Sequence, residues 1–207
     1  MRRNWGALGA ANEFRAKRRP FRIRKGLLLS TLAAAALAPL LWPTVIAGQM
    51  TIAEYQVKAG YLVNFLKFVE FPEELFGNAR APIVIGTVGD DPLPPQLEQA
   101  VIGKIVQGRT LVVRKYHSGE DMREAHILII SAVERKHVPQ ILAGLQGSNV
   151  LTIAELDGFL EEGGMVQFAS ENGAARFAIN LSVTKLTTVR ISSKLLTLAR
   201  VVGGNAK

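Results

Sequence analysis

The chain contains no cysteine. This absence excludes disulfide bonds, thiolate zinc sites, iron–sulfur ligation and a cysteine nucleophile. Histidine is scarce, and His117, His126 and His137 show no spacing typical of a metal site. The Gly-x-Ser-x-Gly pattern of α/β-hydrolases is also missing. The sequence therefore predicts no catalytic residue, no metal site and no cofactor.

The body of the chain also lacks a charge imbalance. The net charge is +8, but the first 49 residues hold nine of the 25 basic residues and one of the 17 acidic residues. Residues 50–207 therefore carry sixteen of each and are neutral. Because binding to nucleic acids depends on positive charge that attracts phosphate, we expect no nucleic-acid partner.

The first 47 residues have the pattern of a secretory signal. A basic segment is followed by an apolar one, no charge occurs between Lys25 and Glu54, and small residues come at the end. We predict a signal peptide over 1–47, cleaved after Ala47, which places the body in the periplasm. An uncleaved membrane anchor is the alternative. The pair Arg18-Arg19 leaves both Sec and twin-arginine export open.

The body opens with a helical pattern. Thr51 and Glu54 form a capping box, and apolar residues then recur at helical spacing until Phe71 and Pro72, which end the pattern. The segments that follow are expected to be a strand at 82–89, a helix at 95–102, a loop at 103–109, strands at 110–116 and 125–131, a helix at 134–145 and a strand at 149–153.

The pattern changes in the last quarter of the chain. Two apolar runs, 165–169 and 176–180, flank Asn172-Gly173, a strong signal for a β-hairpin. Two helices are expected to follow, at 181–189 and 192–202. The fold class is thus α/β: a single domain over 51–203, with a mostly parallel sheet flanked by helices and an antiparallel C-terminal hairpin.

Four side chains are candidates for binding a partner or ligand. Tyr61 and Phe65 belong to the aromatic surface of the first helix, which packs in the core or extends into an interface. Arg176 and Asn180 share one face of the last predicted strand and could hold an anion or a partner's backbone. The alternative is a structural arginine and an asparagine that caps the next helix.

Four segments together resemble the YfiR-like periplasmic proteins. They span 55–72, 83–92, 150–166 and 176–199, and they occur in the order typical of that family. The resemblance implies a periplasmic α/β domain that forms a homodimer and restrains an inner-membrane diguanylate cyclase by binding its sensor domain. It further implies an OmpA-like outer-membrane lipoprotein as a second partner, and a role in cyclic di-GMP signalling and biofilm formation.

One departure from that family is clear. Its regulatory members carry cysteines that form disulfide bonds, and this chain has none. Control of that kind by redox state cannot operate here, and action on a cyclase stays an open question at this stage.

The sequence is compatible with three classes of function, and each requires a different surface feature. A regulator that binds another protein is favoured by a flat apolar patch on the first helix. A small-ligand binding protein is favoured by convergent polar groups at the carboxyl edge of the sheet, near 86–91. A periplasmic enzyme requires a cleft with an acid–base pair, for which the sequence gives no support.

Overall fold

A computed structural model describes residues 51–171 and 174–204. These residues belong to one compact unit, Gln49–Lys207. The predicted signal peptide 1–47, its cleavage after Ala47 and the predicted hairpin turn Asn172-Gly173 lie outside the described residues. Within them, no helix combines the length and the apolar character needed to span a bilayer.

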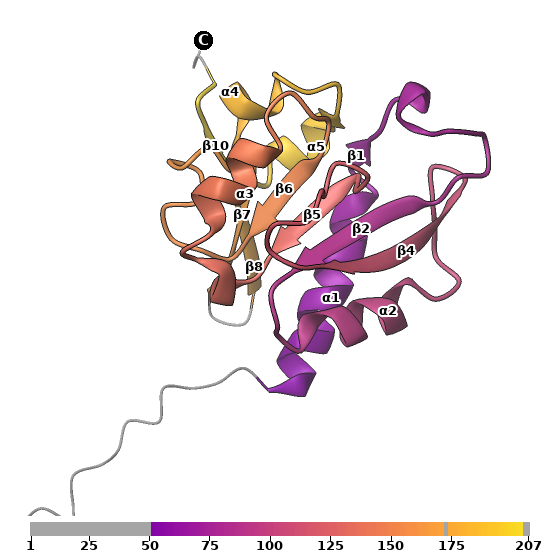
Figure 1. Ribbon diagram of the computed structural model, residues 1–207, viewed down its shortest axis with the longest axis horizontal. Helices are drawn as coiled ribbons and strands as arrows, with labels where there is room; N and C mark the ends of the chain where they lie inside the picture. The colour runs from indigo at the N-terminus through magenta and orange to yellow at the C-terminus, as the bar shows by residue number, and fades with distance from the viewer. Residues whose placement is uncertain (1–50, 172–173, 205–207) are drawn as a thin grey trace, which may run out of the picture. The chain divides into compact units, whose positions relative to one another are not determined.

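An eight-stranded sheet forms the centre of this unit (Figure 1). Its strands are β2 (Ile83–Val88), β3 (Ile105–Val106), β4 (Arg109–Tyr116), β5 (Ile127–Ile130), β6 (Leu151–Ala154), β7 (Val166–Glu171), β8 (Ala174–Asn180) and β10 (Arg200–Val202). They lie in the order β10-β8-β7-β6-β5-β2-β4-β3. The five neighbours from β7 to β4 are mutually parallel, whereas β3 and β8 run antiparallel to their partners β4 and β7.

The parallel strands follow a doubly wound order. The chain enters the sheet at β2, adds β4 on one side and then places β5, β6 and β7 on the other. The order of the strands thus reverses between β2 and β5, and such a reversal creates a crevice at the carboxyl ends of the strands. The predicted α/β fold, with its mostly parallel sheet and antiparallel hairpin, is confirmed.

Helices cover both faces of the sheet (Figure 1). α1 (Ile52–Leu66) and α2 (Leu93–Val101) pack on one face and share a core with Ile85, Ile127 and Ile153. α3 (Val138–Gly144) packs on the other face over Leu128 and Ile130. The continuous apolar runs of β5 and β6 follow from this arrangement, because both faces of these strands are buried.

The first helix begins as predicted and ends earlier. The Thr51 hydroxyl accepts a hydrogen bond from the Glu54 N–H, and the Glu54 carboxylate accepts one from the Thr51 N–H. The helix ends at Leu66, because β1 (Val69–Glu70) pairs antiparallel with β9 (Arg190–Ile191). The apolar residues that extend the helical pattern to Val69 therefore belong to a strand.

The predicted loop at 103–109 is a β-hairpin instead. β3 and β4 are joined by Gln107 (φ 52°) and Gly108 (φ 74°), the two left-handed residues that a tight hairpin turn requires. The Gln107 side chain donates to the Val69 carbonyl at 2.6 Å and accepts from the Phe71 N–H at 3.3 Å. These contacts hold Gln107 in a left-handed backbone conformation that residues other than glycine rarely adopt.

The helices predicted for the second half of the chain are longer than those observed. In place of a helix at 134–145, a 3-10 turn, η3 (Ala132–Glu134), precedes the shorter α3. The predicted helices at 181–189 and 192–202 are each reduced to one turn, α4 (Leu181–Thr184) and α5 (Ser193–Leu196). Residues 200–202 form β10, which pairs with β8, and residues 190–191, between the two predicted helices, form β9, which pairs with β1.

His126, which the sequence places at the start of a buried strand, packs inside an aromatic cluster. Its ring stacks on Phe76 at 4.5 Å and meets Phe71 edge-on at 5.7 Å, and its Nδ1 accepts a hydrogen bond from the Val84 N–H at 3.1 Å. Burial lowers the pKa of His126 below its usual range. A hydrogen bond to the Leu75 backbone opposes this effect, and the nearby Arg109 adds to it.

We predict that His126 makes the protein less stable in acid. Because its pKa is lowered in the folded state, the unfolded chain takes up a proton first, and stability falls as the pH drops below about 6.5. His126→Gln should reduce this loss, since the amide group cannot titrate. Urea unfolding at pH 7.5 and pH 5.5 measures the loss of stability, and His117→Gln, at an exposed histidine, is the control. Equal pH dependence in both variants would contradict this role of His126.

Candidate functional site

Folds with this strand order bind ligands at the carboxyl edge of the sheet, which here lies between β2 and β5. The chain turns at Gly89 after β2 and at Ser131 after β5. Gly89 has φ 105°, and a Cβ atom there would lie 2.6 Å from Ser131 Cβ and 2.9 Å from Val133 Cγ2. Glycine is therefore required where the two turns meet. The run Gly86-Thr87-Val88-Gly89 ends in this tight turn.

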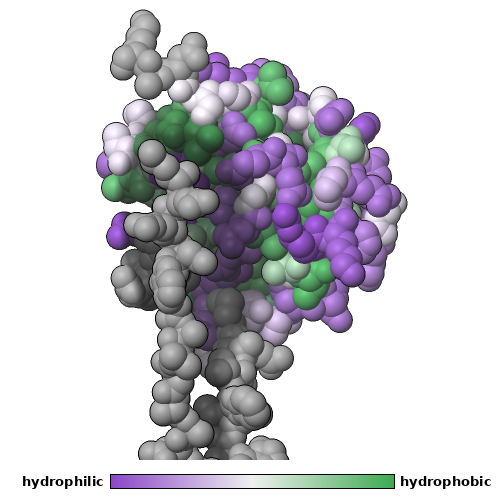
Figure 2. Space-filling view, turned by 90° about the vertical axis from the view of Figure 1, so that its left-hand side faces the viewer, coloured by the Kyte–Doolittle hydropathy of each residue, from purple (hydrophilic) through white to green (hydrophobic). Residues whose placement is uncertain are grey.

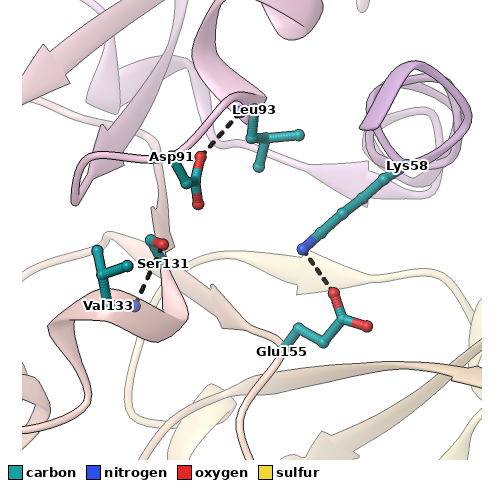
Figure 3. Close-up of polar contacts among 6 residues, drawn as sticks. All are labelled: Lys58, Asp91, Leu93, Ser131, Val133 and Glu155. Carbon is teal, nitrogen blue, oxygen red and sulfur yellow. Dashed lines mark hydrogen bonds and ion pairs between the residues drawn. The ribbon is translucent and has the colours of Figure 1, made fainter. Parts of the chain in front are cut away.

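Polar side chains from four elements meet at this edge (Figure 3). Asp91 Oδ1 accepts the Leu93 N–H at 2.8 Å at the start of α2, and Ser131 Oγ accepts the Val133 N–H at 3.4 Å. Lys58 of α1 forms an ion pair with Glu155, directly after β6, at 2.5 Å between Nζ and Oε2. Figure 3 shows Asp91 and Ser131 facing this ion pair.

The register of the strands places a fifth polar side chain beneath them. Thr87 lies beside Ile129, and Ile129 beside Ile153, so their side chains point to the α1 face of the sheet. Ser131 and Glu155 each follow two residues later on the same face. Thr87 is 3% exposed, and its buried Oγ1 has no hydrogen-bond partner among the described residues. An orphan hydroxyl of this kind is uncommon in a folded protein.

The charges at this edge do not balance. Burial raises the pKa of Tyr55, on the first turn of α1, and the carboxylates of Asp91 and Glu155 raise it further. Among residues 51–171 and 174–204, Lys58 pairs with Glu155 and no cation pairs with Asp91, so one negative charge at this edge has no counter-ion.

A hollow of about 350 Å³ lies elsewhere, between α3 and the loop after β4. The Glu134 carboxylate binds the Ser118 hydroxyl and His137 Nδ1, the latter at 2.8 Å. The Ser118 hydroxyl lowers the pKa of Glu134, and His137 lowers it further. These groups hold the loop to the helix, and the remaining rim is exposed. We find no arrangement of groups here that performs acid–base chemistry.

Apolar surface is also present beside β10. Leu186, Leu198 and Val201 are exposed there, with the charged Arg200 between the last two. Figure 2 shows the molecule from the left of Figure 1. Hydrophobic residues gather at its upper left, and hydrophilic ones cover most of its right side.

The structure separates the two predicted aromatic site residues. Tyr61 is 41% exposed, on the outer face of α1. Phe65 is 3% exposed and packs edge-on against Phe168 at 6.1 Å and Phe177 at 5.8 Å. The proposal of Phe65 as a surface contact is therefore corrected: the β7–β8 hairpin covers its ring, and Phe65 belongs to the core.

The two polar candidates on β8 are also separated. Arg176 is exposed, whereas Asn180, four residues further along β8, is half-buried. The Asn180 side chain accepts the Val183 N–H at 3.3 Å and donates to the Leu160 carbonyl at 3.1 Å. Its polar atoms thus cap α4 and hold the loop before β7, which matches the capping alternative.

The outer face of α1 has an uncharged stripe, flanked by the exposed Glu54. Ala53, Val57, Gly60, Tyr61 and Asn64 share it at helical spacing. Val57 is 56% exposed, and a Cβ atom added at Gly60 would meet no atom within 4 Å. We call these five residues the α1 outer face. Among these five residues, Val57 and Tyr61 are the large side chains exposed to solvent.

Sequence reasoning missed four residues of the carboxyl edge. Ser131 is the last residue of a predicted strand, and Asp91 and Glu155 each come two residues after one, a placement that could have marked them. Lys58 gave no such signal, because its partner Glu155 lies 97 residues away.

The difference between Tyr61 and Phe65 predicts different costs of truncation. Phe65→Ala should lower the free energy of unfolding by about 3–5 kcal/mol, because it removes a ring from the core. Tyr61→Ala should change it by less than about 1 kcal/mol, since an exposed side chain loses little packing. Urea unfolding measures both. Similar losses in the two variants would show that the α1 outer face is covered in the folded protein.

A solved structure and a family model are similar to this chain. A solved structure from Vibrio cholerae, described as a conserved domain protein, aligns with a TM-score of 0.48 and 9% identity. The alignment covers 71% of this chain and 59% of that one, so the chain spans less than two thirds of its length. No curated protein matches. The model of the YfiR/HmsC-like family matches residues 55–200, and the protein therefore belongs to the YfiR/HmsC-like family.

Proposed function

We propose that this protein restrains an inner-membrane diguanylate cyclase by binding the cyclase's periplasmic sensor domain. The YfiR/HmsC-like family is one of periplasmic regulators, and the chain matches it over 146 residues, 55–200. Restraint by binding needs no catalytic group. A regulator that binds one state of a sensor more tightly than the other shifts the population toward that state.

The observation that carries this proposal is the α1 outer face. Interfaces are depleted in charge at their centre and enriched in tyrosine. The α1 outer face combines Tyr61 and Val57 with the small residues Ala53 and Gly60, which allow another backbone to come close. We assign the sensor domain to this surface. A homodimer through the same face is the alternative occupant.

The location and the second partner complete the proposal. The leader 1–47 acts as an export signal that is cleaved after Ala47, or as an anchor that stays in the inner membrane. In both cases the body lies in the periplasm. There an OmpA-like outer-membrane lipoprotein would sequester the protein and release the cyclase. Because the chain has no cysteine, this exchange of partners does not depend on thiol oxidation.

We predict that Gly60→Arg abolishes binding of the partner without unfolding the protein. The new side chain enters open space, and arginine favours a helix by about 0.5–1 kcal/mol relative to glycine. The full chain with a C-terminal tag is recovered from crosslinked, solubilised envelopes of its own organism. The wild type should bring down a membrane protein with a periplasmic sensor and a cyclase output, and Gly60→Arg should bring down at least tenfold less.

The matched control is Gln99→Arg, which adds the same charge at an exposed position of α2. It should recover the partner as well as the wild type does. Equal recovery by Gly60→Arg would remove the α1 outer face as the binding surface. Recovery of nothing but the protein itself would exclude the cyclase and leave the homodimer.

A further inference from the structure

We infer that the carboxyl edge between β2 and β5 binds a small molecule through a protonated primary amine. The site consists of Lys58, Asp91, Ser131 and Glu155 (Figure 3). Tyr55 lies one turn before Lys58 on α1, and the Thr87 hydroxyl is buried in β2 beneath the site. This inference goes beyond the proposed function, because it concerns a ligand and not the protein partner. It also holds whether or not the partner is a cyclase.

The topology is the first reason. In sheets of this kind the loops that leave the strands on either side of the reversal diverge, and ligands bind in the crevice between them. Here the chain goes from Gly89 toward α2 on one face and from Ser131 toward α3 on the other. The N-terminal half of α1 adds Tyr55 and Lys58 to the same place.

Charge determines the class of ligand. Two carboxylates, Asp91 and Glu155, lie at this edge (Figure 3), and one ammonium group, that of Lys58, is paired with Glu155. A cation would balance the remaining charge, and an anion would be repelled. Among the described residues no group of three or more acidic and histidine side chains has the geometry of a metal site. This favours an organic cation over a metal ion.

Unused hydrogen-bonding capacity supports the same class. Within the described residues, Asp91 accepts one hydrogen bond, from Leu93, through one of its two oxygens. Glu155 has a contact at Oε2 alone, and Ser131 accepts from Val133 with no acceptor for its own hydroxyl. A primary ammonium group has three N–H donors that carboxylate oxygens accept, and a hydroxyl on the ligand would satisfy Ser131.

A phosphate ligand fits this edge poorly, although the start of a helix lies there. Phosphate sites at helix N-termini depend on free backbone N–H groups. The Leu93 N–H already binds Asp91, and Pro94 and Pro95 have no N–H to offer. The negative charge of Asp91 would repel the phosphate as well.

The test compares two ligands of equal charge that differ at the nitrogen, where three methyl groups of one replace the three N–H donors of the other. Ethanolamine carries a primary ammonium, and choline carries the same charge with no N–H group. The full chain is expressed with its leader, purified from the envelope fraction and titrated at constant ionic strength. Ethanolamine at ten times its dissociation constant should raise the unfolding midpoint by about 3–5 °C. Choline should bind at least tenfold more weakly.

Substitutions of single residues show which side chains bind ethanolamine. Asp91→Asn keeps the oxygen that accepts the Leu93 N–H, and Glu155→Gln keeps the shape of the side chain. Each should weaken ethanolamine binding at least tenfold. Glu98→Gln removes one negative charge from the exposed surface of α2 and should leave binding unchanged.

Three results would overturn the inference. They are no shift with ethanolamine or putrescine up to 10 mM, equal binding of choline, or equal weakening by Glu98→Gln. A shift with inorganic phosphate in place of the amines would assign the edge to an anion instead. None of these results affects recovery of the protein partner, so the failure of one proposal is distinguishable from the failure of the other.

Discussion

The arrangement of the sheet depends on the close packing of β2 between β4 and β5. Gly86 makes this possible, because a Cβ atom at that position would lie 2.9 Å from the Tyr116 ring and 3.0 Å from Leu128 Cδ1. The absent side chain leaves room for Tyr116 to cover the strand. Gly89 then allows the turns after β2 and β5 to touch. The reversal of strand order, and with it the candidate site, rests on these two glycines.

The central elements could be predicted from the sequence, and the peripheral ones could not. The apolar runs of β2, β5 and β6 are long and buried on both faces, so their pattern is clear. β9 and β10 are two and three residues long and exist because distant strands pair with them. Their local pattern is equally compatible with a helix. The β3–β4 turn has a local signal, Gln107-Gly108, but its glutamine is held by β1, which lies 38 residues earlier.

The candidate site shows the same limit. Helical spacing puts Tyr61 and Phe65 on one aromatic surface, but it does not say which part of that surface the β7–β8 hairpin covers. Phe168 and Phe177 decide this by packing on Phe65. Likewise, a carboxylate after a strand can be read from the sequence, whereas its lysine partner on α1 can be found from the three-dimensional fold alone.

The two proposed surfaces are physically connected through α1. Lys58 points to the carboxyl edge, and Tyr61, three residues later, belongs to the α1 outer face. A ligand amine that binds Glu155 shares its carboxylate with the Lys58 ammonium. If the position of α1 differs with and without the Lys58–Glu155 ion pair, a ligand that breaks the pair favours one of the two positions of the α1 outer face. The coupling can be no larger than the ligand's difference in affinity for the two states, and by linkage the partner would change the ligand's affinity by the same factor.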